Sequence, residues 1–347
     1  MNYDISLPLH VPEQIALYES SHLLMHDVCR FDPAQAVVKL QTSREVMAID
    51  IGGDKIRGAI FSVGDGNLTK LDECSLQSKG GAGYLSFLER LAEEAKAGDL
   101  GVGISSATKL EGTRITRTVN LPVFFEEFRR KYNADYENLF RGTLFVANDT
   151  ITGICGASTH LALQGRDIQD LAFFICASGL GASVLKDETA THVEIGHVPL
   201  MDSLNPLGQT KPCGVEGKDY VCVERVTAAR AGIEDLYLKQ TGEAKDGKTL
   251  GRMYEEGDAL STVLYETSAL ALSHATVGVM NRYSFSDSDR SAVVFHGGNL
   301  EIEKYRDELI RNLMELPRAR SQVIFSRDLS ENVCLDGAAI LSVYHHP

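Results

Sequence analysis

The region that most constrains the fold is residues 46–63, where two apolar runs rich in β-branched residues flank a short turn. The runs cover residues 46–51 and 56–63, and the turn between them reads Gly-Gly-Asp-Lys. Apolar runs of this length on both sides of a glycine-containing turn predict a tight β-hairpin. We therefore expect a pair of antiparallel strands here.

The turn of this hairpin is suited to phosphate groups. Gly52 and Gly53 have no Cβ atom, so a ligand can approach the backbone, and successive exposed N–H groups form a cavity that attracts phosphate oxygens. Asp50, at the end of the first strand, is a residue of the type that holds hydrated Mg²⁺ beside phosphates. From these residues alone, an ordinary hairpin with a Gly-Gly turn is an equally good interpretation.

Strands and helices alternate after the hairpin, which predicts an α/β sheet with layers on its faces. The expected strands cover residues 67–77, 100–105 and 143–147, and an amphipathic helix is expected over residues 82–97. In open sheets of this kind, ligands gather at the carboxyl ends of the strands. The polar residues at the predicted strand ends are Asp50, Ser105, and the pair Asn148 and Asp149.

The second half of the chain begins with a similar unit. A strand over residues 171–176 is followed by small residues, among them Ser178, Gly179 and Gly181, and then by a strand over residues 183–186. This turn is also suited to phosphate, although a plain glycine-rich hairpin turn explains it equally well. The remaining expected elements are strands over residues 291–295 (just before Gly297 and Gly298) and 322–326, and helices over residues 258–283, 301–316 and 336–344.

Length, charge and cysteine usage exclude several classes of protein. A chain of 347 residues with 44% hydrophobic residues is long enough for two domains, each with its own core. The formal charge of −14 argues against a large nucleic-acid-binding surface, which needs clustered Lys and Arg. No apolar run is long enough to span a membrane, and the N-terminus lacks the pattern of a secretion signal. The 7 cysteines, at irregular spacing, favour reduced thiols in a cytoplasmic protein over a disulfide framework.

Residues 1–45 form an extension ahead of the hairpin, and residues 12–28 have the apolar pattern of a helix. His22 and His26 lie on this segment, but two histidines on one helix face without a third donor favour a surface position over a metal site. The extension is shorter than a winged-helix domain and is not basic, so we do not expect it to bind DNA. We expect it to pack on the first domain or on a partner subunit.

Several short motifs, taken in order, carry a resemblance to a known family. They read D-I-G-G-D-K, G-V-G-I, A-N-D-T, A-S-G-L-G-A, E-I-G-H, C-G…C-V-E and H-G-G-N. Together they resemble the ROK family of sugar kinases, repressors and open-reading-frame products, from residue 46 to the C-terminus. The resemblance implies an α/β protein with the actin-like ATPase (ribonuclease H-like) fold, two α/β domains around a cleft, and a homodimer. We expect residues 46–148 in a small domain on which residues 336–347 pack, and residues 149–335 in a large domain.

The resemblance also implies roles for residues within these motifs. Asp149 stands where the family has its catalytic aspartate, and would take the proton of the sugar hydroxyl while Asn148 orients the ring. From the residues alone, Asn-Asp after a strand is better explained as a helix N-cap, because both side chains accept backbone N–H bonds. The sugar-binding residues implied are Asn148, Asp149, Glu194, His197, Glu224 and Asn120. The nucleotide-binding residues implied are Asp50, Gly52, Gly53, Asp54, Lys55, Ser178, Gly179 and Gly181, with Gly297 and Gly298 beside the adenosine.

A zinc site is a further expectation from the resemblance, since many ROK proteins bind zinc through one histidine and three cysteines. His197, Cys213 and Cys222 would supply three ligands here, but Lys211 stands in the place of the first cysteine. A closed structural zinc site has four ligands, and Asp219 could provide the fourth. The alternative interpretation is two buried thiols without a metal.

Three departures from the family pattern bear on activity. Asp54 stands where the family has Thr, and its carboxylate would repel phosphate unless a metal or Lys55 offsets the charge. Ala-Ser replaces Gly-Thr at residues 177–178, and Ser-Ser-Ala replaces Pro-Gly-Pro at residues 105–107. Because the base and the sugar-binding carboxylates are present, we expect an ATP- and Mg²⁺-dependent, glucokinase-like carbohydrate kinase that acts on the 6-hydroxyl of a hexose or N-acetylhexosamine. The alternative is a catalytically impaired ROK-fold sugar-sensing or regulatory protein.

Overall fold

The structure is a computed structural model that describes residues 25–118, 121–140, 142–200, 204–205, 211–213, 219–286, 288–316 and 321–345. The chain divides into two compact units. We call unit 1 the part that contains Ala172–Ala182 and Val193–Phe325, and unit 2 the part that contains Asp27–Leu171, Ser183–His192 and Ser326–Pro347. The domain boundaries expected from the sequence, at residues 45, 148 and 335, remain a proposal.

Unit 2 contains a five-stranded sheet with the order β4-β3-β2-β5-β8. Its strands are β2 (Arg44–Ile51), β3 (Lys55–Gly64), β4 (Asn67–Gln77), β5 (Gly101–Ser106) and β8 (Leu144–Asn148). The predicted hairpin is confirmed, because β2 and β3 pair antiparallel in a continuous register from Arg44 opposite Val63 to Ile51 opposite Ile56. β5 runs parallel to both β2 and β8, so the carboxyl ends of these three strands meet at one edge.

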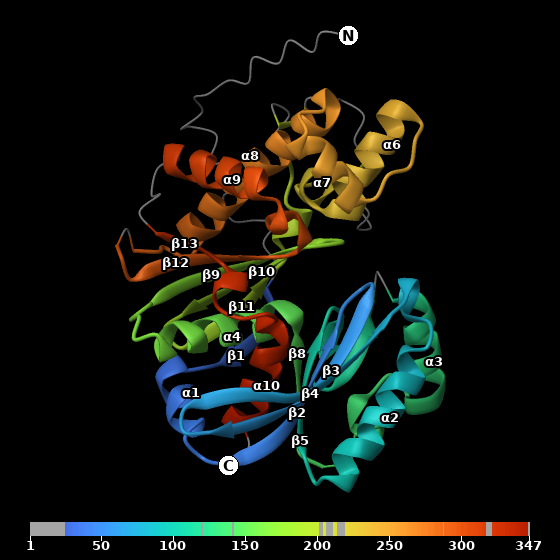
Figure 1. The fold of residues 1–347 in the computed structure, drawn as a ribbon, viewed down its shortest axis with the longest axis vertical. Helices are drawn as coiled ribbons and strands as arrows, with labels where there is room; N and C mark the ends of the chain where they lie inside the picture. The colour runs from blue at the N-terminus through green and yellow to red at the C-terminus, as the bar shows by residue number, and fades with distance from the viewer. Residues whose placement is uncertain are drawn as a thin grey trace. The chain divides into compact units, whose positions relative to one another are not determined.

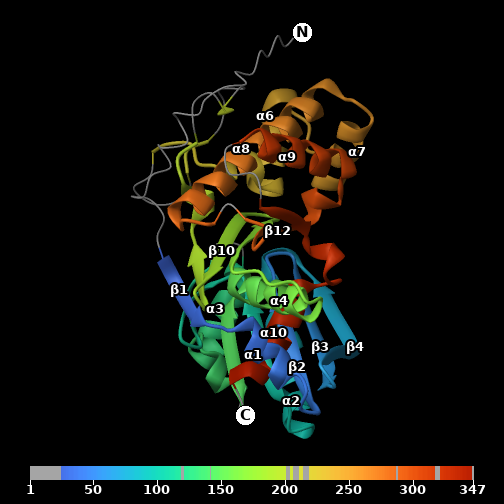
Figure 2. The same cartoon turned by 90° about the vertical axis from the view of Figure 1, so that its left-hand side faces the viewer.

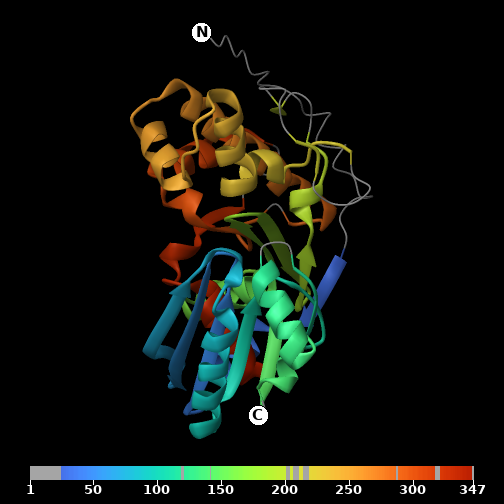
Figure 3. The same cartoon turned by 90° about the vertical axis from the view of Figure 1, so that its right-hand side faces the viewer.

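Helices cover both faces of this sheet (Figures 1, 2 and 3). On one face lie α2 (Tyr84–Ala97) and α3 (Pro122–Tyr132), and on the other lie α4 (Asp149–Leu163) and α10 (Val333–His345). Side chains alternate between the faces of a strand, so Ile49 and Ile51 face the α2 side and belong to its hydrophobic core. Asp50, the residue between them, therefore faces α4 and α10.

Close backbone contacts hold α10 against the sheet and against α4. A Cβ atom at Gly103 of β5 would lie 1.9 Å from the carbonyl oxygen of Ala338 in α10. A Cβ atom at Gly337 would lie 1.8 Å from the carbonyl oxygen of Thr152 in α4, and one at Gly156 would lie 2.2 Å from that of Val333. Only glycine permits such approaches, so these glycines fix where the start of α10 lies.

The start of the described chain differs from the expectation. Residues 12–24 of the expected helix lie outside the described residues, but its last residues belong to a strand, β1 (Met25–Arg30). A short helix, α1 (Pro33–Lys39), follows and packs against α4 and α10 of unit 2. Asp32 caps α1 by accepting hydrogen bonds from the backbone N–H groups of Ala34 and Gln35. Further short elements of unit 2 are β6 (Lys109–Glu111), β7 (Arg114–Arg117) and the helices η2 (Lys79–Gly81), η3 (Tyr136–Asn138) and η8 (Ser326–Asp328).

A second sheet has the order β1-β11-β10-β9-β12-β13. Its remaining strands are β9 (Asp170–Cys176), β10 (Leu180–Lys186), β11 (Thr189–Val193), β12 (Ser291–His296) and β13 (Gln322–Phe325). β12 and β13, in unit 1, pair in parallel. The helices of unit 1 are α5 (Glu224–Thr227), η6 (Ala229–Glu234), α6 (Asp235–Thr241), α7 (Gly247–Glu255), α8 (Ala259–Arg282), α9 (Glu303–Glu315), η4 (Ile195–His197) and η7 (Gly298–Glu301).

The helices α6 to α9 lie together beside β12 and β13 (Figures 1 and 2). Three tyrosines from three of these helices are fully buried in their core: Tyr254 stacks on Tyr265, and the Tyr305 ring meets that of Tyr265 edge-on. All of the cysteines, which number 7, are free thiols. Within the ranges described above, no helix is both long and apolar enough to cross a membrane.

Candidate active site

The predicted strand-end residues of unit 2 lie on adjacent strands. Asp50 of β2 is paired in register with Ser105 of β5, and Ser106 of β5 with Asn148 of β8. Because these strands are parallel, their carboxyl ends form one edge, as the sequence predicted. This edge therefore gathers a carboxylate, a hydroxyl and an amide before α4 begins.

Asp50 is held by side chains from three other segments of unit 2. Ser105 Oγ donates to Asp50 Oδ1 at 3.0 Å, and Asn332 Nδ2, from the loop before α10, donates to Oδ2 at 3.4 Å. Arg57 Nη1 lies 3.3 Å from Oδ2 and forms an ion pair with it. Thr152 of α4 extends the network, since its Oγ1 lies 2.9 Å from Ser105 Oγ. Asp50 thus ties β2, β3, β5 and the start of α10 together.

The hairpin turn at residues 52–55 contains a hydrogen bond between two of its own backbone groups. The Gly52 N–H donates to the Lys55 carbonyl oxygen at 2.9 Å, and a Cβ atom at Gly52 would lie 3.2 Å from that oxygen. Gly52 and Gly53 do not have positive φ angles, so the close approach explains the glycine at residue 52. Tyr84 donates to the Gly52 carbonyl oxygen at 3.4 Å, and burial, with Asp54 and Asp50 nearby, raises the pKa of Tyr84 to about 12. Its hydroxyl is therefore a hydrogen donor at neutral pH.

Asn148 is the N-cap of α4, which bears out the alternative interpretation of this pair. Its Oδ1 accepts a hydrogen bond of 2.9 Å from the Thr150 N–H. Asp149 follows in the first turn of the helix and is partly exposed, so it is positioned to meet a ligand. The cap does not exclude a role in binding, because the Asn148 amide nitrogen points away from the helix N–H groups.

Asp50 and Asp149 lie on the same side of the sheet of unit 2. The Cys334 thiol, at the start of α10, is fully buried, and burial together with the charges of these two carboxylates holds its pKa well above the usual range. Both carboxylates therefore contribute to the electrostatic environment of this thiol. Asn120, which the family resemblance implies as a sugar-binding residue, lies outside the described residues.

In unit 1, Glu224 links two of the predicted binding segments. Glu224 Oε1 accepts a hydrogen bond of 3.1 Å from the Leu180 N–H, in the turn that includes Ser178, Gly179 and Gly181. A Cβ atom at Gly179 would lie 2.6 Å from the same oxygen, which explains the glycine there. The other carboxylate oxygen, Oε2, lies 3.8 Å from His197 Nδ1. Glu194 directly precedes η4, the short helix that contains His197.

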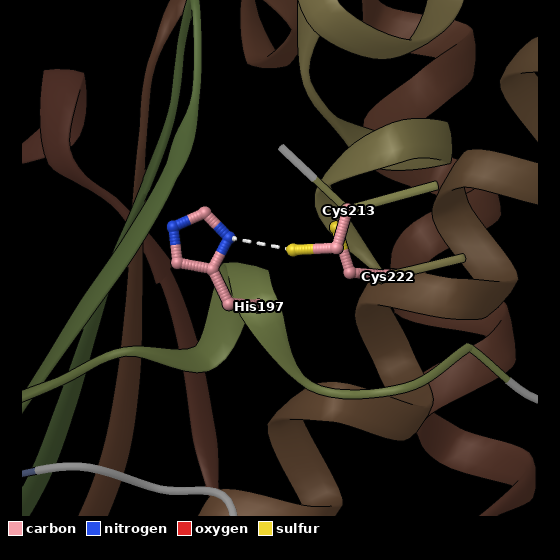
Figure 4. A group of neighbouring side chains, drawn as sticks. All are labelled: His197, Cys213 and Cys222. Carbon is pink, nitrogen blue, oxygen red and sulfur yellow. Dashed lines mark hydrogen bonds between the residues drawn. The ribbon is translucent and has the colours of Figure 1, made fainter. Parts of the chain in front are cut away.

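His197, Cys213 and Cys222 come together as one cluster (Figure 4), with ligand atoms within 4.8 Å of one another. Cys213 Sγ lies 3.6 Å from His197 Nδ1. Sulfur and nitrogen ligands of one tetrahedral zinc ion lie about 3.5 Å apart, so the two distances agree. Burial, and to a smaller extent the neighbouring Cys213, raises the pKa of the Cys222 thiol to about 12. A bound cation would offset the free-energy cost of forming the thiolate here. The donor set fits zinc.

Neither Asp219, considered for the fourth zinc ligand, nor Lys211, which stands in the place of the family's first cysteine, joins this cluster. Asp219 is exposed and is not part of it, and Lys211 Nζ instead pairs with Asp235 at 2.5 Å. Among the described residues the cluster therefore has three protein ligands.

Gly297, the first of the two glycines expected beside adenosine, follows β12 directly. Its φ angle is 132°, and a Cβ atom there would lie 2.0 Å from the Cys176 carbonyl oxygen. Gly298 begins η7 and is exposed, and a Cβ atom there would have no neighbouring atom within 4 Å. The backbone of Gly297 thus lies in close contact with the end of β9, while Gly298 is exposed to solvent.

Sequence reasoning missed three contacts of these residues. The Arg57–Asp50 ion pair follows from the hairpin register, because the two residues are opposite one another across the turn. The bond between Leu180 and Glu224, and that between Asn332 and Asp50, join segments far apart in the chain. No local pattern predicts contacts of that kind.

Comparisons with known proteins agree with this architecture. The ROK hexokinase of Thermus thermophilus is similar in structure, with a TM-score of 0.62 and 22% identity over 86% of this chain and 97% of that chain. The ROK family glucokinase of Streptomyces griseus, solved with glucose and AMPPNP, has a TM-score of 0.58 and 20% identity over 86% of this chain and 99% of that one. A ROK family transcriptional regulator homologous to the E. coli MLC protein has a TM-score of 0.58 and 16% identity, with 90% of each chain covered.

These likenesses show that the chain has the actin-like ATPase fold that the family resemblance implied. A comparison with curated proteins gives no match. The sequence pattern of the ROK family matches residues 46–343, most of the chain. The chain therefore belongs to the ROK family.

Proposed function

We propose that this protein is an ATP-dependent kinase that phosphorylates a hexose or N-acetylhexosamine at the 6-hydroxyl, with Asp149 as general base. The observation that carries the proposal is the position of Asp149, in the first turn of α4 at the strand edge that also carries Asp50. Phosphoryl transfer requires alignment, charge neutralisation and a group that takes the proton of the acceptor hydroxyl. A partly exposed carboxylate is suited to taking the proton, and a second, hydrogen-bonded carboxylate on the same side of the sheet is suited to holding the cation that would neutralise charge.

The proposed sugar-binding group is made of Asn148, Asp149, Glu194, His197 and Glu224. Carboxylates accept hydrogen bonds from sugar hydroxyls, while the Asn148 amide and the His197 ring supply donors. If His197 binds zinc through Nδ1, its Nε2 carries the hydrogen and remains a donor. The zinc would fix the ring orientation, with Cys213 and Cys222 as the other ligands.

For the nucleotide, we propose that the 52–55 turn, with its Asp54 and Lys55, and the 178–181 turn bind phosphates, and that Gly297 and Gly298 lie beside the adenosine. Mg²⁺ held between the ATP phosphates and Asp50 would supply charge neutralisation during transfer. Asp50 has both oxygens engaged by neutral or cationic donors, and a carboxylate has acceptor positions beyond these three. We further propose that the kinase is cytoplasmic and acts as a homodimer.

The second candidate is a sugar-sensing or regulatory protein that kept the fold without catalysis. It is favoured by Asp54, whose carboxylate lies in the hairpin turn, and by the Arg57–Asp50 ion pair, which already neutralises the carboxylate proposed to hold Mg²⁺. The structural likeness to a ROK transcriptional regulator is compatible with this candidate.

Turnover separates the two candidates. ATP consumption is measured with a panel of hexoses and N-acetylhexosamines, and sugar affinity is measured by isothermal titration with and without nucleotide. We expect ATP- and Mg²⁺-dependent phosphorylation of at least one sugar, and Asp149→Asn should lower kcat by about 100-fold or more while sugar binding survives. Sugar binding without turnover would favour the regulatory protein, and an unchanged kcat in Asp149→Asn would remove Asp149 as the base.

A further inference from the structure

A buried chain of hydrogen bonds in unit 2 ends on Asn148. Thr150 Oγ1 lies 2.8 Å from Asn148 Oδ1 and 2.7 Å from Nδ1 of His192 in β11. All three residues are at least nine-tenths buried, with exposed fractions of 9% for Asn148, 1% for Thr150 and 6% for His192. Polar groups this deeply buried are costly unless they are paired, so the bonds between them restrict the geometry strongly.

The number of available hydrogens fixes the direction of each bond. Asn148 Oδ1 also accepts from the Thr150 N–H, so the oxygen of this amide, and not its nitrogen, faces Thr150. An amide oxygen can only accept, so the single hydroxyl hydrogen of Thr150 goes to Asn148. The His192 Nδ1 must then carry a hydrogen and donate it to Thr150 Oγ1. The chain therefore runs from His192 through Thr150 to Asn148.

This direction determines what Asn148 can offer to a ligand. Its oxygen is occupied by two bonds from Thr150, and its amide nitrogen lies 3.5 Å from the Thr108 carbonyl oxygen. The NH₂ group has two hydrogens, so one remains for a ligand. Ser183 in β10 adds a second link to the same turn, because its Oγ donates to the Thr150 carbonyl oxygen at 2.7 Å.

We propose that Thr150 and His192 are positioning residues, which hold the Asn148 amide as a hydrogen donor toward the sugar and fix the helix turn that carries Asp149. This inference rests on the proposed kinase function and adds two residues to it. Neither residue touches the reacting atoms; they act through Asn148 and through the first turn of α4. Misplacement of a catalytic group by about 1 Å can cost about 100-fold in rate.

The test uses a variant that keeps the shape of Thr150 but removes its hydroxyl. Thr150→Val should lower kcat or raise the sugar KM so that kcat/KM falls about tenfold or more, while Thr150→Ser, which keeps the hydroxyl, should stay near the wild-type values. His192→Asn, which can place an amide donor near the position of Nδ1, should retain more activity than His192→Phe. Thr159→Val is the matched control, since Thr159 is a buried threonine of the same helix whose hydroxyl bonds to the Cys155 carbonyl oxygen. The control should change the melting temperature but not the kinetics.

A second measurement judges the bonds independently of turnover. Nitrogen-15 spectra of labelled histidine should show that the hydrogen of His192 is on Nδ1 in the wild type and in Thr159→Val, and that this signal shifts in Thr150→Val. A hydrogen on Nε2 alone would overturn the proposed direction. Wild-type kinetics in Thr150→Val would overturn the positioning role, even if its melting temperature fell. If the wild-type protein binds a sugar but has no turnover, the proposed function fails. The role of Thr150 is then judged from sugar affinity. An affinity weakened about tenfold in Thr150→Val would support this role, and an unchanged affinity would overturn it.

Discussion

The Glu224 carboxylate accepts a hydrogen bond of 3.1 Å from the backbone N–H of Leu180. Glu224 begins α5, whereas Leu180 begins β10 at the end of the 178–181 turn. The residue expected to bind sugar is therefore also a structural part of the turn expected to bind phosphate. The second carboxylate oxygen lies 3.8 Å from His197 Nδ1, so the same side chain also adjoins the cysteine–histidine cluster.

This double contact predicts different effects for two substitutions of Glu224. Glu224→Gln keeps an oxygen that accepts from Leu180, so the turn and the ATP KM should be preserved while the sugar KM rises. Glu224→Ala removes the acceptor and should raise the KM for both substrates, by about tenfold for ATP, because a hydrogen bond to a charged group contributes about 1.5–3 kcal/mol. Steady-state kinetics with each substrate varied in turn measure both effects. Equal ATP KM values in the two variants would show that the bond to Leu180 does not support nucleotide binding.

The cysteine–histidine cluster should bind zinc. We expect about one zinc per chain in the purified protein, and both Cys213→Ser and Cys222→Ser should lose it, because serine hydroxyls are poor zinc ligands at neutral pH. Elemental analysis measures the metal content, and a thermal melt with and without a chelator measures its effect on stability. Cys74→Ser is the control, since Cys74 is a free, half-buried thiol of β4 outside the cluster. Zinc retained in both cluster variants would place the metal elsewhere.

The sequence predicts best the elements whose pattern is local. The hairpin of β2 and β3 is an example, because apolar residues and a turn within twenty residues determine its register, and β4 was predicted with the bounds that the structure gives. The prediction was wrong for residues 25–28, where apolar residues that suit a helix belong to a strand, β1. Val28 of that strand is 58% exposed. An apolar side chain at an exposed position breaks the alternation of buried apolar and exposed polar residues by which a strand is recognised in a sequence. The signals for α1 were present, since Asp32 and Pro33 form an N-cap followed by proline at the first helical position.

The candidate site is predictable only in part for a related reason. The order of short motifs predicts Asp149, Glu224 and the cysteine–histidine cluster through family resemblance. The partners of these residues come from distant segments, such as Asn332 for Asp50 and His192 for Thr150. Such contacts depend on how helices and sheets pack, and that packing is set by contacts between glycines and facing backbones rather than by any local pattern.

Two neighbouring serines of β5 offer a matched test of the contacts to Asp50. Ser105 and Ser106 are both fully buried, but Ser105 donates to Asp50, while Ser106 faces the other side and bonds to Thr108 and Tyr136. Replacement of either by alanine should lower the free energy of unfolding by about 1–2 kcal/mol, since each loses buried hydrogen bonds. Only Ser105→Ala should change the affinity for ATP with Mg²⁺, because only this variant loosens Asp50. Titration with nucleotide and chemical denaturation measure the two quantities, and parallel changes in both variants would contradict the assignment of Asp50 to the nucleotide site.

The contact between α4 and α10 predicts a large effect on stability from a single methyl group. A Cβ atom at Gly337 would lie 1.8 Å from the Thr152 carbonyl oxygen, and backbone cannot move aside as the end of a side chain can. Gly337→Ala should therefore lower the free energy of unfolding by about 2–3 kcal/mol, near the upper end of the range for overpacked cores. It should also weaken activity, because Thr152 lies one turn after Asp149 and the first turn of α4 would shift with it.

The control is Gly247→Ala, at the first residue of α7, where the nearest atom to a Cβ would be Glu234 Oε1 at 3.3 Å. Alanine restricts the unfolded chain more than glycine does, so this variant should be neutral or more stable by about 0.5–1 kcal/mol. Chemical denaturation of the two variants provides the comparison. Equal stabilities would mean that α4 and α10 can separate at little cost, and the close glycine contacts would then not fix the position of the helix that carries Asp149.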